Sequence, residues 1–353
     1  MPISAVDSIP IAFRHTSEQI FKPFRFGQWN RLALVGLLAG ELGGGGLRSV
    51  SNFTNRHHGG LGGMHIDPAA LAAVIAVLVA SGLILGLIFM YVGSVMRFIL
   101  FDSVLAKECH IRLGWNRRQS EGMKYFLFKL VYALVSLFVL IVLVGIPAAF
   151  AYASGWFREP KAHLAPLILG GLLLFFLLFI FVVASAVVLV LTKDFVVPQM
   201  ALEGIGVVES WRRLWAMMQT EAGSYAAYIG MKIALSIGAG IIVGIATAIM
   251  ALIIALPAVF LGVLAVITGK SAGLTWDAYT ITLAIVVGCI LFAGFFYLVS
   301  LLSVPVIVFF PAYSIYFFAG RYPRLAAALY PASAVPSPVP PARLIPPNPE
   351  PIG

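Results

Sequence analysis

Five stretches of this chain run for more than twenty residues with few charged side chains, over roughly 69–100, 124–153, 164–192, 225–250 and 278–309. A helix rises 1.5 Å per residue, so about 20 apolar residues cross a hydrocarbon core about 30 Å thick. The chain has 353 residues, 61% of them hydrophobic and only 10% charged, whereas soluble domains carry about 25% charged residues. The sequence therefore predicts an all-α protein, a polytopic transmembrane helix bundle.

A weaker sixth span is predicted over residues 32–47, where Glu41 and the run Gly43–Gly46 interrupt the apolar residues. This segment either crosses fully or re-enters on the same side. Six spans place both termini on one side, and the Lys and Arg residues outside the spans divide fourteen to five in favour of that side. Because cytoplasmic loops are enriched in Lys and Arg, we expect both termini in the cytoplasm and a cell inner membrane location.

An internal repeat is the second feature of the spans. The phrase Ile146–Phe150 (IPAAF) returns as Leu256–Phe260 (LPAVF), and each copy follows a basic connector that bears tryptophan. This pattern predicts two to three direct repeats of a helix pair. Since proline lacks the amide proton that a helix interior needs, we expect Pro147 and Pro257 to break their helices at equivalent elbows.

The connectors between the spans are predicted to form amphipathic helices on the cytoplasmic surface. In the second connector, apolar residues recur at the three-and-four spacing of such a helix, and Glu209 and Arg213 are placed to pair across one turn. The aromatic and basic side chains of the two connectors are candidate functional residues for contact with lipid or a protein partner: Trp115, Arg117, Arg118, Trp211, Arg212 and Arg213.

Charged residues within the spans are the other candidates. Glu41 is either an ion or proton ligand or an ordinary carboxylate that lies near the membrane surface or faces other helices. We favour the ordinary carboxylate because no second acidic residue accompanies it in the spans. Lys232, with Arg97 and Lys129, is expected to be an anchor that reaches the headgroups, with a substrate path as the alternative.

Three regions follow from composition. Residues 1–29 form an interfacial segment of aromatic and basic residues, and residues 30–330 form the transmembrane helical domain. Residues 331–353 form a disordered proline-rich tail, which is a second place where a protein partner could dock.

Small residues spaced by four, such as Ser236, Gly240 and Gly244, predict close helix packing. The net charge of +9 suits anionic membrane lipids better than nucleic acid, which we do not expect as a partner.

Catalytic and cofactor motifs do not occur in the sequence. It has no nucleophile elbow, P-loop or zinc-binding helix, and His57, His58 and His65 match no established metal spacing. We therefore expect no enzyme activity, cofactor or metal.

The connector pattern Phe195-Val196-Val197-Pro198, Glu203-Gly204 and Trp211-Arg212-Arg213-Leu214 resembles bacterial membrane proteins related to the membrane domain of glycerophosphoryl diester phosphodiesterases. The resemblance covers roughly residues 10–320 in layout, through short and degenerate motifs. In that family a separate soluble barrel domain, absent from this sequence, carries the phosphodiesterase chemistry. The resemblance thus implies a fold and a membrane location, without a catalytic residue.

These observations favour a non-enzymatic scaffold or accessory protein that organises lipid or a partner at the cytoplasmic face. The alternative is a transporter of small solutes or lipid, because repeated helix pairs with proline breaks also occur in transporters. Polar residues around a cavity at mid-membrane depth would indicate transport, whereas a dry interior packed with Gly and Ala would indicate a scaffold.

Overall fold

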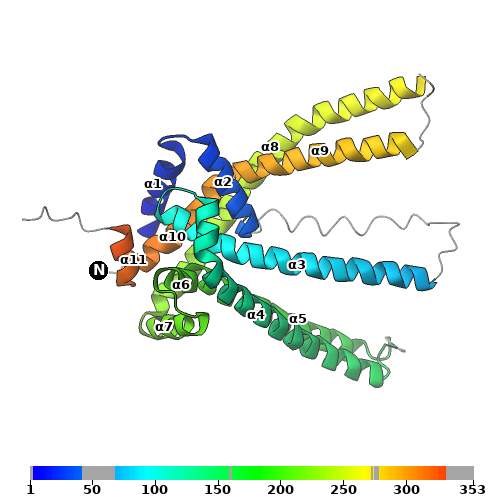
Figure 1. Cartoon of the computed structure of the whole chain (residues 1–353). Coiled ribbons are helices and arrows are strands. Elements are labelled where there is room, and N and C mark those ends of the chain that lie inside the picture. Colours follow the sequence, from blue (N-terminus) through cyan, green and yellow to red (C-terminus); the bar gives the residue numbers. More distant parts are fainter. Residues whose placement is uncertain are drawn as a thin grey trace, which may run out of the picture.

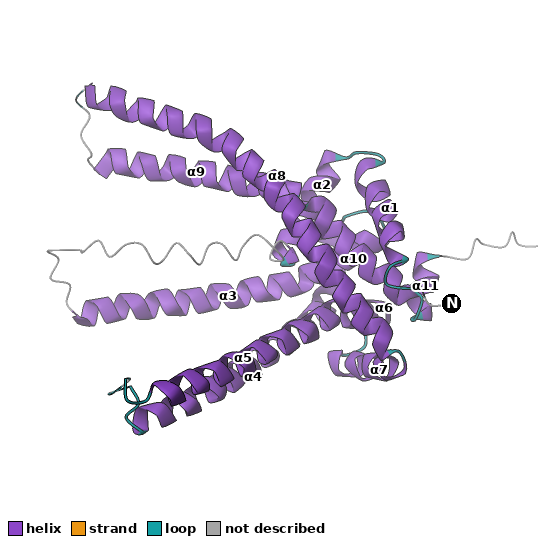
Figure 2. Ribbon diagram, turned by 180° about the vertical axis from the view of Figure 1, so that it is seen from behind, coloured by secondary structure: helices purple, strands orange, loops and turns teal. Residues whose placement is uncertain are grey.

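The computed structural model of the chain describes residues 3–41, 68–157, 159, 161–271, 273 and 278–330. All regular elements in these residues are helical, which confirms the predicted all-α class. Short helices form a head at one end of the molecule, and long helices extend from it as diverging arms (Figures 1 and 2).

The arms consist of α3 (Pro68–Leu105), α4 (Ile111–Ala153), α5 (Leu164–Leu191), α8 (Ala222–Ser271) and α9 (Ala278–Leu302). Five stretches in them are long and apolar enough to cross a membrane, and their most apolar windows are 0% buried in four cases and 6% in the fifth. Helix α5 lies beside α4, and α9 beside α8 (Figures 1 and 2). The protein is therefore a multi-pass membrane protein whose arms bury little of their surface within the chain.

The head contains α1 (Ser8–Phe21), α2 (Phe26–Leu38), the π-helical turn η3 (Thr192–Val196), α6 (Val197–Glu203), α7 (Val207–Thr220), α10 (Val304–Ala319) and α11 (Pro323–Leu329). Its centre is α10, which packs against α1, α2, α3 and η3. The Tyr228 ring lies 4.6 Å from that of Phe317 and 5.0 Å from that of Phe195, between centroids. Aromatic rings from distant parts of the chain thus fill the head.

The described part of the N-terminal segment 1–29, which composition distinguished from the spans, belongs to the head. Helix α1 packs along α10 and buries Ala12, His15 and Ile20. Phe13 and Phe21 of the same helix are 69% and 52% exposed. Aromatic side chains of this segment therefore remain on the surface of the head.

Two glycines mark close helix contacts, one between α2 and α10 in the head and one between the arms α3 and α4. A Cβ atom on Gly36 would lie 2.4 Å from the side chain of Ile307, and one on Gly122 would lie 2.6 Å from that of Val95. In contrast, a Cβ atom added to Gly240 or Gly244 would have no other heavy atom within 4 Å outside its own helix backbone. At these two positions of the small-residue stripe, α8 therefore makes no close contact with another described helix of this chain.

The predicted first span over residues 32–47 is not a crossing in the part that the structure describes. Helix α2 ends at Leu38 and has 13 residues, so it is about 20 Å long and too short for a core about 30 Å thick. It packs against α3 and α10 in the head instead, and residues 42–47 lie outside the described residues. The described ranges contain five candidate spans, where the sequence predicted six.

The two predicted proline elbows were also wrong. Helix α4 continues past Pro147 to Ala153, and α8 continues past Pro257 to Ser271. A proline removes one amide donor, whereas a full break would leave several backbone groups without partners in a medium that has no water to satisfy them. Continuous helices are therefore the better solution for segments surrounded by lipid.

Candidate functional site

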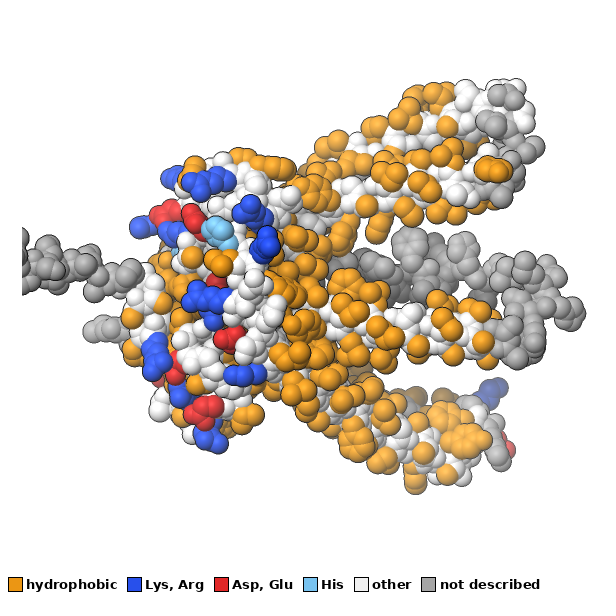
Figure 3. Space-filling view, in the orientation of Figure 1, with side chains coloured by type: hydrophobic (Ala, Val, Ile, Leu, Met, Phe, Trp, Pro, Cys, Tyr) orange, Lys and Arg blue, Asp and Glu red, His pale blue; other side chains and the backbone are white. Residues whose placement is uncertain are grey.

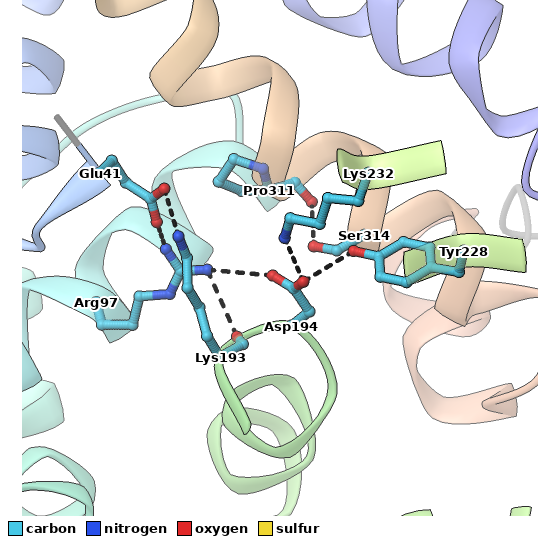
Figure 4. Close-up of polar contacts among 8 residues, drawn as sticks. All are labelled: Glu41, Arg97, Lys193, Asp194, Tyr228, Lys232, Pro311 and Ser314. Atoms are coloured by element: carbon cyan, nitrogen blue, oxygen red, sulfur yellow. Dashed lines mark hydrogen bonds and ion pairs between the residues drawn. The ribbon is translucent and has the colours of Figure 1, made fainter. Parts of the chain in front are cut away.

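Five charged side chains meet where the arms enter the head (Figure 4). We call this set the junction cluster: Glu41, Arg97, Lys193, Asp194 and Lys232. Glu41 lies just after α2, Arg97 is on α3, and Lys232 is on α8. Lys193 and Asp194 are on η3. Segments that are far apart in the sequence therefore supply one polar centre.

Asp194 is the most deeply buried member of the junction cluster, with 1% of its side chain exposed. Its Oδ2 atom accepts a hydrogen bond from the hydroxyl of Tyr228 at 2.9 Å and pairs with the ammonium of Lys232. Its Oδ1 atom lies 3.7 Å from Nη2 of Arg97. The carboxylate stands on a π-helical turn, an element that is rare and often found at functional sites.

Arg97 connects the two carboxylates of the junction cluster. Its Nη1 atom pairs with Oε1 of Glu41, and its Nη2 atom is 3.5 Å from the carbonyl oxygen of Lys193. The ammonium of Lys193 donates to Oε2 of Glu41 at 2.5 Å. Glu41 and Arg97 each expose only 6% of their side chains, so both ions depend on their partners for solvation.

Burial makes these pairs costly to disturb. Removing one partner of a buried ion pair costs about 3–5 kcal/mol, because the other charge is left without compensation. Next to the cluster is a cavity of about 10 Å³, which Arg97, Lys193 and Ser314 help to line. Such a volume holds about one water molecule, so the charged groups chiefly satisfy one another.

The structure places both span candidates in the junction cluster. Glu41 faces other helices, which was one of the two placements expected for an ordinary carboxylate, but it does not lack an acidic neighbour, since Asp194 belongs to the same cluster. Lys232 does not extend toward the headgroups as a free anchor, since it is buried and its ammonium pairs with Asp194. Sequence reasoning missed Asp194, although its position directly after a long apolar run was a signal that it lies at the end of a span.

The first connector divides into an internal and a surface part. Arg118 donates to both oxygens of Asp102 at 2.7 and 2.8 Å and to the carbonyl of Ala201 at 2.7 Å, so it joins α4 to α3 and α6. Trp115 is half-buried against the ring of Tyr91. Of the three predicted residues in this connector, Arg117 is the one that is exposed.

The second connector forms α7, as predicted, and Glu209 pairs with Arg213 across one turn at 3.2 Å. Arg213 also donates to Glu203 at 2.8 Å, and its hydrogen bonds to Glu203 and Glu209 raise the pKa of the guanidinium. Arg212 is 77% exposed, and Trp211 packs partly against the core of the head. The connector candidates thus surround the head and do not join the junction cluster.

A separate groove of about 480 Å³ lies on the head, lined among others by His15, Lys107 and Tyr316. The ring nitrogens of His15 lie 3.0 Å from the hydroxyl of Tyr316 and 2.9 Å from the carbonyl of Val104. Burial, and then the charge of Lys107, lower the pKa of His15 below its usual value of 6.5. The imidazole is thus fixed between α1, α3 and α10.

Metal binding has no geometric support within the described ranges, where no three His, Cys, Asp or Glu side chains gather. His57, His58 and His65, considered above as ligands, lie outside these residues, as does the proline-rich tail 331–353.

Comparison with known proteins identifies the family. The sequence model of a protein family of unknown function, DUF7544, matches residues 3–328. The chain belongs to this family. No curated protein and no solved structure matches it. The match includes the head, the arms and all five members of the junction cluster, so these parts form one family unit.

Proposed function

We propose that this protein is a non-enzymatic membrane scaffold whose head holds diverging arms in place, so that their apolar surfaces organise lipid or a membrane partner. The observation that carries this proposal is the exposure of the arms. Four of the five apolar windows are 0% buried within the chain, so their natural contacts lie outside it.

The junction cluster supports a mechanical role better than a transport path. A transporter places its polar groups around a substrate site near the middle of the membrane. Here the charged groups lie at the arm–head junction and pair with one another around a cavity of about 10 Å³. We infer that the cluster fixes α3, η3 and α8 against the head.

The distribution of charge supports a cytoplasmic head in a cell inner membrane. Lys, Arg, Asp and Glu gather over the head, whereas hydrophobic side chains cover the arms (Figure 3). Since Lys and Arg concentrate on the cytoplasmic side of membrane proteins, the head faces the cytoplasm, and residues 3 and 330 at the head bring both ends of the described chain to that side.

Helix α7 supports a contact surface on the head. Val208 is 75% and Trp215 57% exposed, and Arg212 is beside them in the same helix. Apolar and basic side chains together suit the headgroup layer or a protein partner. The resemblance to the membrane domain of glycerophosphoryl diester phosphodiesterases agrees with such an accessory role, because in those proteins the chemistry belongs to another domain.

The test is a flux assay in proteoliposomes. The full chain is reconstituted as wild type, Glu41→Gln and Lys232→Met, and the efflux of entrapped small anions, cations and labelled lipid is compared with that of protein-free vesicles. A scaffold produces no flux above the vesicles alone. Wild-type flux that disappears in either variant would overturn the proposal and establish transport.

A second measurement concerns α7. Trp215→Ala and Arg212→Gln should weaken co-purification of the native lipids or partner. Lys161→Gln serves as a charge-matched control, since it removes an exposed cation just before α5, outside both connectors. Equal recovery from all variants would remove α7 from the proposed surface.

A further inference from the structure

The turn between α1 and α2 exposes a group of aromatic side chains. Phe21, Phe24 and Phe26 are 52%, 59% and 58% exposed. The rings of Phe21 and Phe24 pack against the indole of Trp29 on α2, with centroids 5.5 and 5.3 Å apart. We call this set the aromatic turn: Phe21, Phe24, Phe26 and Trp29. Three large apolar rings that are neighbours in sequence therefore remain open on the head.

The aromatic turn lies at the depth where an arm leaves the membrane. The indole Nε1 of Trp29 donates a hydrogen bond to the carbonyl oxygen of Leu301 at 2.9 Å, and α2 packs beside the head-side end of α9 (Figure 1). At the other end of α9, Asp277 directly precedes the helix in the sequence, and a charged residue there keeps that end out of the hydrocarbon. The helical path from Ala278 to Leu301 is about 35 Å, against a core about 30 Å thick. Trp29 is therefore in the headgroup layer on the side of the head.

Basic side chains accompany the rings, without acidic ones. Residues 21–31 contain Lys22, Arg25 and Arg31 but no Asp or Glu. Lys22 is exposed. Arg25 lies 3.9 Å from Glu108 in a pair whose side chains are 62% and 59% exposed, so its guanidinium remains accessible. The charge of the turn thus complements an anionic surface.

The combination of rings, cations and depth identifies lipid as the partner. Aromatic rings concentrate at the membrane–water interface, and Lys and Arg beside a span are attracted to anionic headgroups. A soluble protein would have to displace lipid to cover rings at this depth. Composition assigned all of residues 1–29 to the interface, but α1 packs along α10 and buries Ala12 and Ile20. The structure therefore favours the turn over the whole segment as the membrane contact.

We propose that the aromatic turn inserts into the headgroup layer of an anionic membrane surface, with Lys22 and Arg25 at the lipid phosphates. The turn then fixes the height of the head against the leaflet at the point where α9 emerges. This inference goes beyond the scaffold function and does not rest on it, because the head of a transporter would be held in the same way.

The experiment places an environment-sensitive nitrobenzoxadiazole label on the full chain. Cys109→Ala and Cys289→Ala first remove the free thiols, and Phe24→Cys then carries the label. Tyr330→Cys is the matched control, because it is also 59% exposed and follows α11, at the end of the head away from the arms (Figures 1 and 2). In vesicles of phosphatidylcholine and phosphatidylglycerol, the label at position 24 should emit at shorter wavelength and be quenched by doxyl-labelled lipid. The label at position 330 should behave as in water. Circular dichroism checks that each variant is folded.

The charge is tested with Lys22→Gln and Arg25→Gln. Each cation near an anionic surface strengthens association about fivefold. The ratio of inserted to exposed label at position 24 should therefore fall about 25-fold in the double variant, and stay unchanged in pure phosphatidylcholine. Arg324→Gln on α11, where the arginine side chain is 65% exposed, should leave the ratio unchanged in both lipids.

Equal emission and quenching at positions 24 and 330 would overturn the insertion. Insertion that is the same in the double variant as in its parent, or that falls equally in Arg324→Gln, would overturn the part played by Lys22 and Arg25.

Discussion

Replacing Asp194 with asparagine keeps the shape of the side chain and removes the charge that two buried cations face. Only 1% of the Asp194 side chain is exposed, and it pairs with Lys232 and lies 3.7 Å from Arg97. The amide can still accept the hydrogen bond that Tyr228 donates at 2.9 Å, so the loss is mainly electrostatic. Because a buried charge without its partner costs about 3–5 kcal/mol, Asp194→Asn should lower the free energy of unfolding by about that amount.

A double-mutant cycle separates this effect from a general loss of packing. Lys232→Met removes the cation and leaves Asp194 with Arg97 and Tyr228, so its cost should be smaller, about 1–3 kcal/mol. In the double variant no lysine charge is left unpaired. We therefore expect Asp194→Asn with Lys232→Met to be more stable than Asp194→Asn alone, with a coupling energy of about 2 kcal/mol.

The assay is reversible unfolding in mixed micelles with increasing sodium dodecyl sulfate, followed by tryptophan fluorescence and by circular dichroism to check two-state behaviour. Arg212→Gln is the control: its partner Glu209 lies in an exposed pair, which is worth about 0.5 kcal/mol or less. A cost below about 1 kcal/mol for Asp194→Asn, or simple additivity in the double variant, would refute the view that the junction cluster holds the arms to the head.

Three further predictions concern packing, the first connector and pH. Gly122→Ala should destabilise the head by about 1–3 kcal/mol through overpacking, whereas Gly240→Ala on the open face of α8 should be neutral or slightly stabilising in the same unfolding assay. Arg118→Gln should cost about 2–4 kcal/mol and the exposed Arg117→Gln about 0.5 kcal/mol or less; equal effects would contradict the assigned internal role of Arg118. Because burial lowers the pKa of His15, the unfolded state takes up a proton first as pH falls below about 6.5. Stability should therefore decrease in that range, and thermal unfolding of His15→Gln should show a smaller decrease than the wild type.

The spans and α7 were the parts of the fold that the sequence could predict. Long apolar runs have one stable solution in a bilayer, which is a helix with all its backbone groups paired. In α7 the local spacing alone placed Glu209 and Arg213 on one face, and the pair forms at 3.2 Å. Both predictions depend on residues that are close in sequence, where helical geometry determines the outcome.

The errors arose where the surroundings of a segment decide its structure. Residues 32–41 have the composition of a weak span, yet α2 lies against Ile307 of α10, with Gly36 at the contact, so other helices and not lipid bury it. Pro147 carries the usual signal for a break, yet the helix continues, because unpaired backbone groups in lipid would cost more than a single lost hydrogen bond. Composition cannot tell burial by protein from burial by lipid, and that difference determined both outcomes.

The junction cluster extends this argument from segments to charges. Taken singly, each lysine or arginine at the end of a span is adequately explained as an anchor, because a long side chain can reach the headgroups from there. The anchor interpretation takes no account of partners, however, and at the junction the partners decide the role. Lys232 is fixed by Asp194, while the ammonium of Lys129 lies over the ring of Tyr125. Two lysines with the same sequence signal therefore differ in role: Lys232 fixes α8 to the head, whereas Lys129 takes part in no ion pair among the described residues. The placement of Asp194 by η3 separates them, since that turn brings a carboxylate within reach of Lys232 on α8, whereas no carboxylate of the described residues pairs with Lys129 on α4.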